Sequence, residues 1–549
     1  MLEGLVQQDF PLTIGYVVDR LRTVNGGGEI VSSTGEGTER ARYDEVAARV
    51  DRLCAALRDL GVREGDRVAT LAWNHQRHFE CYLAIPAMGA VLHTLNLRLF
   101  PDQLAYIANH AEDTIVFLDD SLVELWEKVV PQLETVRHNV LMGDGDGGSL
   151  PNLIRYEDLL AGQDDGFDYP QIDDRQAAAL CYTSGTTGNP KGVLYSHRSS
   201  VLHSLGACLA DTLAVSRADR VLPIVPMFHA NAWGLPYAAA LAGADLVMPN
   251  RWLQAEPLCR LIEGERVTVS GAVPTIWMDI LRYADKHHPD LSSLRLVACG
   301  GSAVPRALME ALEERHDVPV CQAWGMTETS PLGSVARPPR DAEGERHWQY
   351  RSTAGRPVAL VEVRIVGDEG DALPWDGKAE GELECRGPWV ASAYYRDAAP
   401  EKFHDGWLRT GDIASIDPDG YIIIRDRTKD VIKSGGEWIS SVDLENELMA
   451  HPDVLEAAVI AKPDERWAER PLACVVVREG AELDADQVAA HLEPRVARWW
   501  VPDEYAFIDE VPKTSTGKFD KKVLRQRLAD GELADRQTVT RKAEPARSS

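Results

Sequence analysis

The segment 182–192 combines hydroxyl, glycine and lysine residues in an order suited to holding a polyphosphate. Gly185, Gly188 and Gly192 let backbone amides approach phosphate oxygens, and Lys191 adds a point charge. The Walker pattern G-x-x-x-x-G-K-S/T occurs nowhere in the chain. The segment therefore predicts a phosphate-binding loop of another kind. Further hydroxyl donors come from Thr183, Ser184, Thr186 and Thr187.

Six more segments follow this loop, and the seven together resemble one known family. The six are Gly300-Gly-Ser302, Ala323-Trp-Gly-Met-Thr-Glu328, and the stretches 406–412, 426–430, 433–437 and 512–518. Their types and order resemble the AMP-forming adenylating superfamily, which includes acyl- and aryl-CoA synthetases, luciferases and peptide-synthetase adenylation domains. The resemblance extends over roughly residues 30 to 530. It implies that ATP activates a carboxylic acid as an acyl-adenylate, which a thiol then accepts.

The resemblance implies an ATP site that works with Mg²⁺. The acid and ATP are both anions, so their charge must be neutralised, and Mg²⁺ prefers hard oxygen ligands. Thr183 and Glu328 are the implied metal ligands. Trp324 stands where the family usually has tyrosine, and an indole is expected to stack equally well on adenine. The implied ATP- and AMP-binding residues are Thr183, Ser184, Gly185, Thr186, Thr187, Gly188, Lys191, Gly300, Gly301, Ser302, Gln322, Ala323, Trp324, Gly325, Met326, Thr327, Asp412, Arg427, Lys433 and Lys518.

The C-terminal motifs are implied in both half-reactions. Lys518 is the implied catalytic lysine, because its ammonium can bridge the attacking carboxylate and the α-phosphate. Asp426 resembles the hinge about which a small domain rotates to remove Lys518 after adenylation. The implied catalytic set is Lys518, Thr183, Glu328 and His229, and the implied CoA-facing residues are Lys433, Gly435, Gly436, Glu437 and Trp438.

The segment 226–237 is the most informative for the acid substrate. It combines apolar residues with His229 and carries no lysine or arginine that could pair with a second carboxylate. The run resembles medium- and long-chain fatty acyl-CoA synthetases, so Trp233 is predicted to be an acyl gate. A structural core role for Trp233 or His229 stays open. The predicted function is an ATP-dependent fatty acid–CoA ligase with fatty acid, ATP and CoA as substrates.

Three alternatives share these motifs. A fatty acyl-AMP ligase would load a carrier protein in trans. A luciferase-type oxygenase is disfavoured because the C-terminal Ala546-Arg-Ser-Ser549 differs from a peroxisomal Ser-Lys-Leu signal. A non-catalytic sensor of acyl-nucleotides would not need the transferable Lys518.

The elements that must position these residues alternate between apolar strands and amphipathic helices. Apolar residues recur at near-helical spacing over 44–61 and predict a helix, with a second helix predicted over 78–89. Apolar runs at 68–72 and 115–118 predict strands. This alternation favours an α/β fold with parallel pairing.

The pattern changes towards the C-terminus. Strands are predicted over 361–366, 381–385, 421–424, 457–461 and 473–477, and helices over 441–450 and 484–498. The expected architecture is a large adenylating domain of layered α/β subdomains with a β-rich subdomain, followed by a small mobile α+β domain. The expected boundaries are 1–425 for the first domain, 426–431 for the hinge, 432–540 for the second domain and 541–549 for a disordered tail.

Composition excludes several classes of protein. The 549 residues carry a formal net charge of −28, a field that repels nucleic acid. No run approaches the ~18 to 20 apolar residues of a membrane span, and the N-terminal residues do not resemble a secretory signal. Nine cysteines without framework spacing suit a reducing cytoplasm. By analogy with the fatty acid branch, a homodimer is expected.

Overall fold

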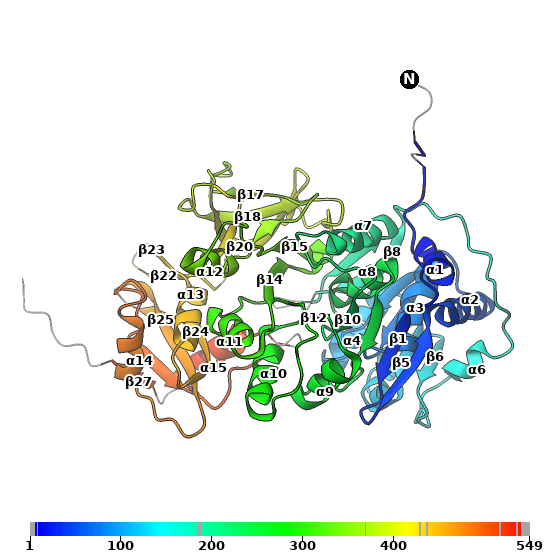
Figure 1. Cartoon of the computed structure of the whole chain (residues 1–549), viewed down its shortest axis with the longest axis horizontal. Helices are drawn as coiled ribbons and strands as arrows, with labels where there is room; N and C mark the ends of the chain where they lie inside the picture. Colours follow the sequence, from blue (N-terminus) through cyan, green and yellow to red (C-terminus); the bar gives the residue numbers. More distant parts are fainter. Residues whose placement is uncertain are drawn as a thin grey trace, which may run out of the picture. The chain divides into compact units, whose positions relative to one another are not determined.

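The computed structural model describes residues 6–7, 9–183, 189–367, 369–427, 430–434, 437–464, 466–514, 518–533 and 536–539. The chain divides into two compact units (Figure 1). Unit 1 comprises 1–302, 311–363 and 385–408, and unit 2 comprises 303–310, 364–384 and 409–549. The hinge at 426–431 and the domain boundaries beside it stay predictions. The predicted tail at 541–549 lies outside the described residues.

Unit 1 contains a seven-stranded sheet in the order β7-β6-β5-β3-β4-β8-β9. Its strands run parallel except for β9, which pairs antiparallel with β8. The strands are β3 (Arg67–Leu71), β4 (Val91–Thr94), β5 (Asp113–Asp119), β6 (His138–Met142), β7 (Leu153–Arg155), β8 (Ala177–Tyr182) and β9 (Gly192–Ser196). The helices between them are α3 (Gln76–Ala87), α4 (Pro101–Ala111), α5 (Val123–Glu127) and α6 (Tyr156–Leu160). The predicted strands at 68–72 and 115–118 are confirmed as β3 and β5.

A second, nine-stranded sheet has the order β16-β15-β14-β13-β12-β10-β11-β1-β2. Its strands are β1 (Glu29–Ser33), β2 (Thr38–Arg42), β10 (Arg220–Pro223), β11 (Asp245–Met248), β12 (Val269–Ala272), β13 (Leu296–Gly300), β14 (Val320–Gly325), β15 (Leu332–Val335) and β16 (Arg356–Pro357). The accompanying helices are α1 (Ile14–Arg22), α2 (Tyr43–Asp59), α7 (His197–Cys208), α8 (Leu235–Ala242), α9 (Ala255–Glu265), α10 (Pro274–His287), α11 (Arg306–His316) and α12 (Gly344–Arg351). The predicted α/β class is confirmed.

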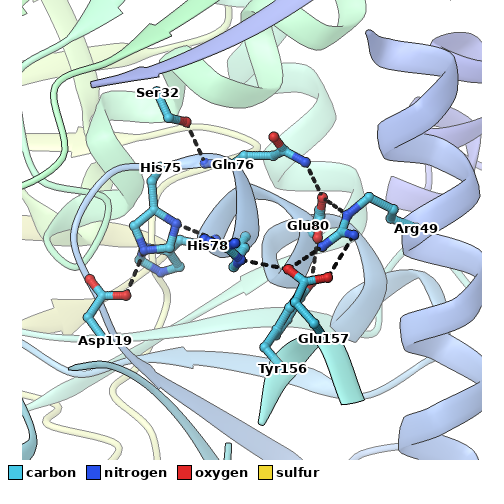
Figure 2. A network of polar contacts seen from close by, with 10 residues as sticks. Ser32, Arg49, His75, Gln76, His78, Glu80, Asp119, Tyr156 and Glu157 are labelled. Carbon is cyan, nitrogen blue, oxygen red and sulfur yellow. Dashed lines mark hydrogen bonds and ion pairs between the residues drawn. The ribbon is translucent and has the colours of Figure 1, made fainter. Parts of the chain in front are cut away.

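A buried ionic network ties α2, α3 and α6 together (Figure 2). The Glu80 carboxylate is fully buried and accepts hydrogen bonds from Arg49 Nε at 2.7 Å and the Tyr156 hydroxyl at 2.5 Å. Arg49 and Arg77 also pair with Glu157. A buried carboxylate is tolerated only when it is paired and hydrogen-bonded, so these contacts hold the three helices in register. The network borders a polar cavity of about 410 Å³.

The C-terminal half of the chain contributes two smaller sheets. A five-stranded sheet joins β17 (Glu362–Val366), β18 (Gly381–Arg386), β19 (Phe403–His404), β20 (Trp407–Ile416) and β21 (Ile422–Arg427). A six-stranded sheet joins β22 (Ile432–Ser434), β23 (Glu437–Ile439), β24 (Val454–Asp464), β25 (Ala468–Val477), β26 (Glu504–Phe507) and β27 (Arg536–Thr538). Helices α13 (Ser441–Met449), α14 (Ala485–Leu492) and α15 (Lys521–Ala529) pack in the same region.

Most predicted elements of this half are confirmed, but the helix predicted over 484–498 is too long. It forms α14 and ends at Leu492. Pro494 explains the early end, because proline has no backbone N–H to continue the helical hydrogen bonds beyond Glu493, which still has helical backbone angles. Within the described part of the chain, no helix is long and apolar enough to cross a membrane.

Candidate active site

The phosphate loop starts where β8 ends and is closed by β9. The backbone N–H of Thr183 donates to the carbonyl of Lys191 at 2.9 Å, and the N–H of Lys191 donates back to Thr183 Oγ1 at 3.1 Å. Lys191 Nζ lies 2.5 Å from Asp397 Oδ2, and this hydrogen bond raises the pKa of the lysine. The middle of the loop, with Ser184, Gly185, Thr186, Thr187 and Gly188, lies outside the described residues.

Four parallel strands bring the other predicted nucleotide motifs of unit 1 to one edge. Strands β10, β12, β13 and β14 are consecutive parallel neighbours. Their carboxyl ends meet at the same edge, which is where ligands bind in open α/β sheets. Gly300 ends β13 opposite Ala323, and a Cβ atom at Gly300 would lie only 2.4 Å from the Ala323 carbonyl oxygen. Glycine is therefore required here. Gly301 follows with φ at +87°, and Ser302 is exposed.

The indole of Trp324 lies across the neighbouring strand β15. A Cβ atom at Gly333 would come within 2.4 Å of the Trp324 ring, so the ring covers this glycine. Trp324 is partly exposed, which leaves part of the indole available for stacking. On the same strand, the side-chain amide of Gln322 donates to the carbonyl of Thr353 at 2.8 Å. A Cβ atom at Gly325 would overlap the carbonyl oxygen of Pro331 at 1.7 Å.

Glu328 lies in a single 3₁₀ turn, Thr327–Thr329, after Met326. Its side chain is 6% exposed, and the Tyr394 hydroxyl donates to its Oε1 at 2.6 Å. Burial, together with the nearby carboxylate, raises the pKa of Tyr394 and keeps the hydroxyl protonated. The Tyr195 hydroxyl donates to the carbonyl of Thr327 at 2.7 Å. The turn is thus held from two sides.

The predicted acyl-gate segment forms a strained left-handed turn after β10. Ala230, Asn231, Ala232 and Trp233 have φ values of 42°, 50°, 50° and 56°. Left-handed backbone costs about 1–2 kcal/mol per non-glycine residue, so surrounding contacts must hold this turn. The N–H of Ala230 donates to Cys181 Sγ at 3.3 Å, and the Tyr82 hydroxyl donates to the carbonyl of Met227.

Trp233 itself is half-buried and lies over the ends of β12 and β13. A Cβ atom built at Gly271 would be 3.5 Å from its ring, and one at Gly300 would be 3.7 Å from it. The indole therefore occupies the space that two glycines leave open beside the nucleotide motifs. His229 precedes the turn and is partly exposed, and its N–H donates to the carbonyl of Pro226 at 3.1 Å.

In unit 2, the two predicted ribose residues face each other on adjacent antiparallel strands. Asp412 on β20 is in register with Arg427 on β21, and Arg427 Nε lies 2.6 Å from Asp412 Oδ1. The Asp412 carboxylate is only 2% exposed, whereas the Arg427 side chain is 40% exposed. This pair presents a buried acceptor beside a partly exposed cation, which suits vicinal hydroxyls and a phosphate.

The predicted hinge residue Asp426 is fully buried and tied to the start of α13. Its Oδ2 accepts from both the N–H and the hydroxyl of Ser441 at 2.6 Å, and desolvation raises its pKa. Lys521 Nζ donates to the same Ser441 hydroxyl at 2.6 Å and pairs with Glu445 at 2.7 Å. Sequence patterns did not single out Lys521 or Glu445.

The remaining predicted residues of unit 2 lie on short connections. The Lys518 loop is closed by Thr514, whose N–H donates to the Lys518 carbonyl at 2.7 Å and whose hydroxyl accepts the Lys518 N–H at 3.2 Å. Lys433 is exposed on β22, and its N–H donates to Glu469. Gly435 and Gly436 lie outside the described residues, as do the side chains of Glu437 and Trp438.

The segment 391–397, which no sequence pattern singled out, contacts both parts of the predicted ATP site in unit 1. The N–H of Ala391 donates to the carbonyl of Glu328 at 2.7 Å, and the N–H of Tyr395 donates to the carbonyl of Gly192 at 2.7 Å. The Asp397 and Tyr394 side chains contact Lys191 and Glu328 respectively. The residues Tyr-Tyr-Arg-Asp carry no glycine or proline signature that would have distinguished this segment from an ordinary surface turn.

Comparisons with known proteins agree with this arrangement. The model of the AMP-binding enzyme family matches residues 23–395, and that of the AMP-binding enzyme C-terminal domain matches 443–518. A solved structure of the anthranilate CoA ligase AuaEII in complex with anthranoyl-AMP superposes with a TM-score of 0.87 at 27% identity, covering 96% of this chain and 100% of that one.

Sequence relatives are closer and match along nearly their whole length. A 3-methylmercaptopropionyl-CoA ligase of Ruegeria pomeroyi is 45% identical, over 95% of this chain and 98% of the relative. A medium-chain fatty acid–CoA ligase of Ectopseudomonas oleovorans is 44% identical, and a long-chain fatty acid–CoA ligase of Thermus thermophilus is 46% identical, each over 94% of this chain and 96% of the relative. The chain therefore belongs to the AMP-binding enzyme family, and the resemblance of its motifs to AMP-forming acyl-CoA synthetases is confirmed.

Proposed function

We propose that the chain is an ATP-dependent fatty acid–CoA ligase for medium- to long-chain acids. It converts fatty acid, ATP and CoA into acyl-CoA, AMP and diphosphate through an acyl-adenylate. The observation that carries this proposal is the 44–46% identity to medium- and long-chain fatty acid–CoA ligases over 94% of the chain. The apolar turn that presents Trp233 beside Gly300 supports it.

In this proposal the nucleotide lies along the edge formed by β13 and β14. Trp324 stacks on adenine, with Gly300 and Gly301 on its other side, and Thr327 contacts the α-phosphate. Lys191 and the hydroxyls of the phosphate loop hold the polyphosphate. Asp412 accepts hydrogen bonds from the ribose hydroxyls, and Arg427 reaches the ribose or a phosphate.

Thr183 and Glu328 are the residues that would hold Mg²⁺. The fit is good because Glu328 offers one buried carboxylate, and Mg²⁺ is commonly held by one or two carboxylates together with substrate phosphates. When bound, the ion neutralises phosphate charge during attack of the acid. Glu328 would offer a carboxylate oxygen to that ion, and Thr183 would offer a hydroxyl oxygen just after the end of β8.

Lys518 provides the charge that bridges the attacking carboxylate and the α-phosphate. Rotation about Asp426 then withdraws Lys518 and brings Lys433, the glycines 435 and 436, Glu437 and Trp438 towards the acyl-adenylate, where they shape the passage for CoA. Trp233 gates the acyl pocket, and His229 lies on the side of the substrate carboxylate.

A shorter thioether acid is the second candidate substrate. The 3-methylmercaptopropionyl-CoA ligase is 45% identical to this chain, so identity alone does not separate it from the fatty acid ligases. Both candidates use the same chemistry and differ in the depth of the acyl pocket. A fatty acyl-AMP ligase that transfers the acyl group to a carrier protein is the alternative within the family.

The test measures pyrophosphate release with ATP and Mg²⁺ across fatty acids of graded length and 3-methylmercaptopropionate, each with and without CoA. Turnover that requires CoA and peaks at a medium or long chain supports the proposal. A peak at the thioether acid supports the second candidate. A single burst that CoA does not release would indicate an acyl-AMP ligase. Lys518→Ala should abolish acyl-AMP formation while thioester formation from supplied acyl-AMP continues.

The setting of the enzyme is also part of the proposal. All nine cysteines are free, which suits a reducing cytoplasm. The net charge of −28 disfavours nucleic acid as a partner. A homodimer is expected by analogy with the fatty acid branch, and sedimentation of the full chain tests it.

A further inference from the structure

Among the described residues, the Tyr394 hydroxyl is the one side-chain group that hydrogen-bonds to the Glu328 carboxylate. The O–H donates to Glu328 Oε1 at 2.6 Å, within a site where Glu328 is 6% exposed. A hydrogen bond to a buried carboxylate is short and strong, and it limits rotation of the carboxylate about its last torsion. With Oε1 engaged by Tyr394, Oε2 is the oxygen that remains for a metal ion.

Tyr394 is itself held by backbone contacts that involve both ATP-site motifs. It forms a tight turn with Asp397, in which N–H groups and carbonyls exchange hydrogen bonds of 2.9 and 3.1 Å. Asp397 pairs with Lys191, and the next residue, Tyr395, donates its N–H to Gly192. The Tyr394 ring also packs edge-on against Phe403, with 5.0 Å between ring centroids. The turn 394–397, which contacts Lys191 and Gly192 at the end of the predicted phosphate loop, therefore positions the hydroxyl at Glu328.

We propose that Tyr394 is a positioning residue for the metal-binding side of the ATP site. Its hydroxyl holds one oxygen of Glu328 so that the other faces the Mg²⁺ that accompanies the nucleotide. The inference rests on the proposed function of Glu328 as a metal ligand. Groups that orient a metal ligand typically change metal affinity by about 10–100-fold when they are removed. Tyr394 should therefore act on the metal-dependent part of ATP binding.

The test is isothermal titration of the full chain with ATP, in Mg²⁺ and in EDTA, for the wild type and Tyr394→Phe. Binding of ATP with Mg²⁺ should weaken by about 10–100-fold in the variant, while binding in EDTA changes less than about twofold. Raising the Mg²⁺ concentration should restore most of the loss. Tyr195→Phe is the matched control, because it removes a buried tyrosine hydroxyl that donates to the Thr327 carbonyl of the same turn and not to the Glu328 carboxylate.

Several results would overturn this inference. The first two are an ATP affinity of Tyr394→Phe that falls equally in Mg²⁺ and in EDTA, and an ATP affinity that is unchanged in both. The others are a loss of ATP affinity that added Mg²⁺ does not restore, and the same metal-dependent loss in Tyr195→Phe. The test needs neither acid nor CoA. A wild type that binds ATP in a metal-dependent way but forms no acyl-CoA would refute the proposed function and leave this inference standing.

Discussion

Replacing Lys521 with methionine should make local unfolding of α13 and α15 more frequent, because the buried contacts between these helices depend on its ammonium. Lys521 opens α15, and its side chain is 10% exposed. Its ammonium donates to the Ser441 hydroxyl at 2.6 Å and lies 2.7 Å from Glu445. The Ser441 hydroxyl in turn donates to the buried Asp426. Lys521→Met leaves two buried carboxylates without their shared cation.

The size of the effect follows from burial. Above about pH 7, where Glu445 is ionised, removing one partner of a buried ion pair costs about 3–5 kcal/mol, because the remaining charge is desolvated without compensation. At about 1.4 kcal/mol per factor of ten, local opening should become roughly a hundredfold to several thousandfold more frequent. The double variant Lys521→Met/Glu445→Gln should recover part of this loss, because the carboxylate in direct contact with the missing ammonium is removed as well.

Hydrogen exchange of the full chain measures this opening in the amides of α13 and α15. The matched control is Lys522→Met, which removes a neighbouring, exposed ammonium from the same helix. Exchange of α13 should accelerate in Lys521→Met and stay within twofold of the wild type in Lys522→Met. Equal protection of α13 in all three proteins would refute the argument that Lys521 holds this helix to Asp426.

Three further predictions follow from charges at or near the proposed site. Burial raises the pKa of Glu445 to about 7, above the ~4.3 of an unfolded chain. The contribution of this carboxyl to the free energy of unfolding is therefore fully present below pH ~4.3, and it is lost as the pH rises through about 7. Glu445→Gln should flatten that slope between pH 6 and 7.5 in exchange measurements, and an unchanged slope would argue against it. Asp412→Asn should weaken AMP binding roughly tenfold in calorimetry, since a neutral acceptor bonds ribose less strongly and releases Arg427; unaltered affinity contradicts the ribose assignment. Asp397→Asn should strengthen ATP binding by less than about fivefold at low salt, because this partly exposed carboxylate competes with phosphate for Lys191. Weaker ATP binding in the variant would contradict this competition and indicate that Asp397 helps to position Lys191.

Much of the proposed site rests on the sequence because its motifs are local. The phosphate loop is recognisable because hydroxyls, glycines and a lysine must follow one another within a single turn. Asp412 and Arg427 were both chosen from their own motifs, and the structure pairs them across β20 and β21 at 2.6 Å. The strands at 68–72 and 115–118 were predicted correctly because uninterrupted apolar runs bounded by polar residues have few other stable conformations.

Other features depend on contacts that no local pattern encodes. Tyr394 is an ordinary tyrosine in sequence, and only the fold brings its hydroxyl to a carboxylate 66 residues away. Lys521 reads as one of several basic residues near Lys518, yet burial against α13 makes it the cation of a buried cluster. The left-handed turn that ends at Trp233 could not be predicted from the sequence either, because its residues favour right-handed backbone when no tertiary contacts oppose them.

The sequence by itself therefore determined the family, the α/β class and the residues whose types can perform adenylation. Those properties rest on side-chain chemistry and on short-range spacing, which the chain carries before it folds. The tertiary structure alone decided which oxygen of Glu328 is held, where the Trp233 indole lies and which lysine is buried. Each of these depends on desolvation and on the approach of segments far apart in sequence, and both arise only when the sheets and helices pack.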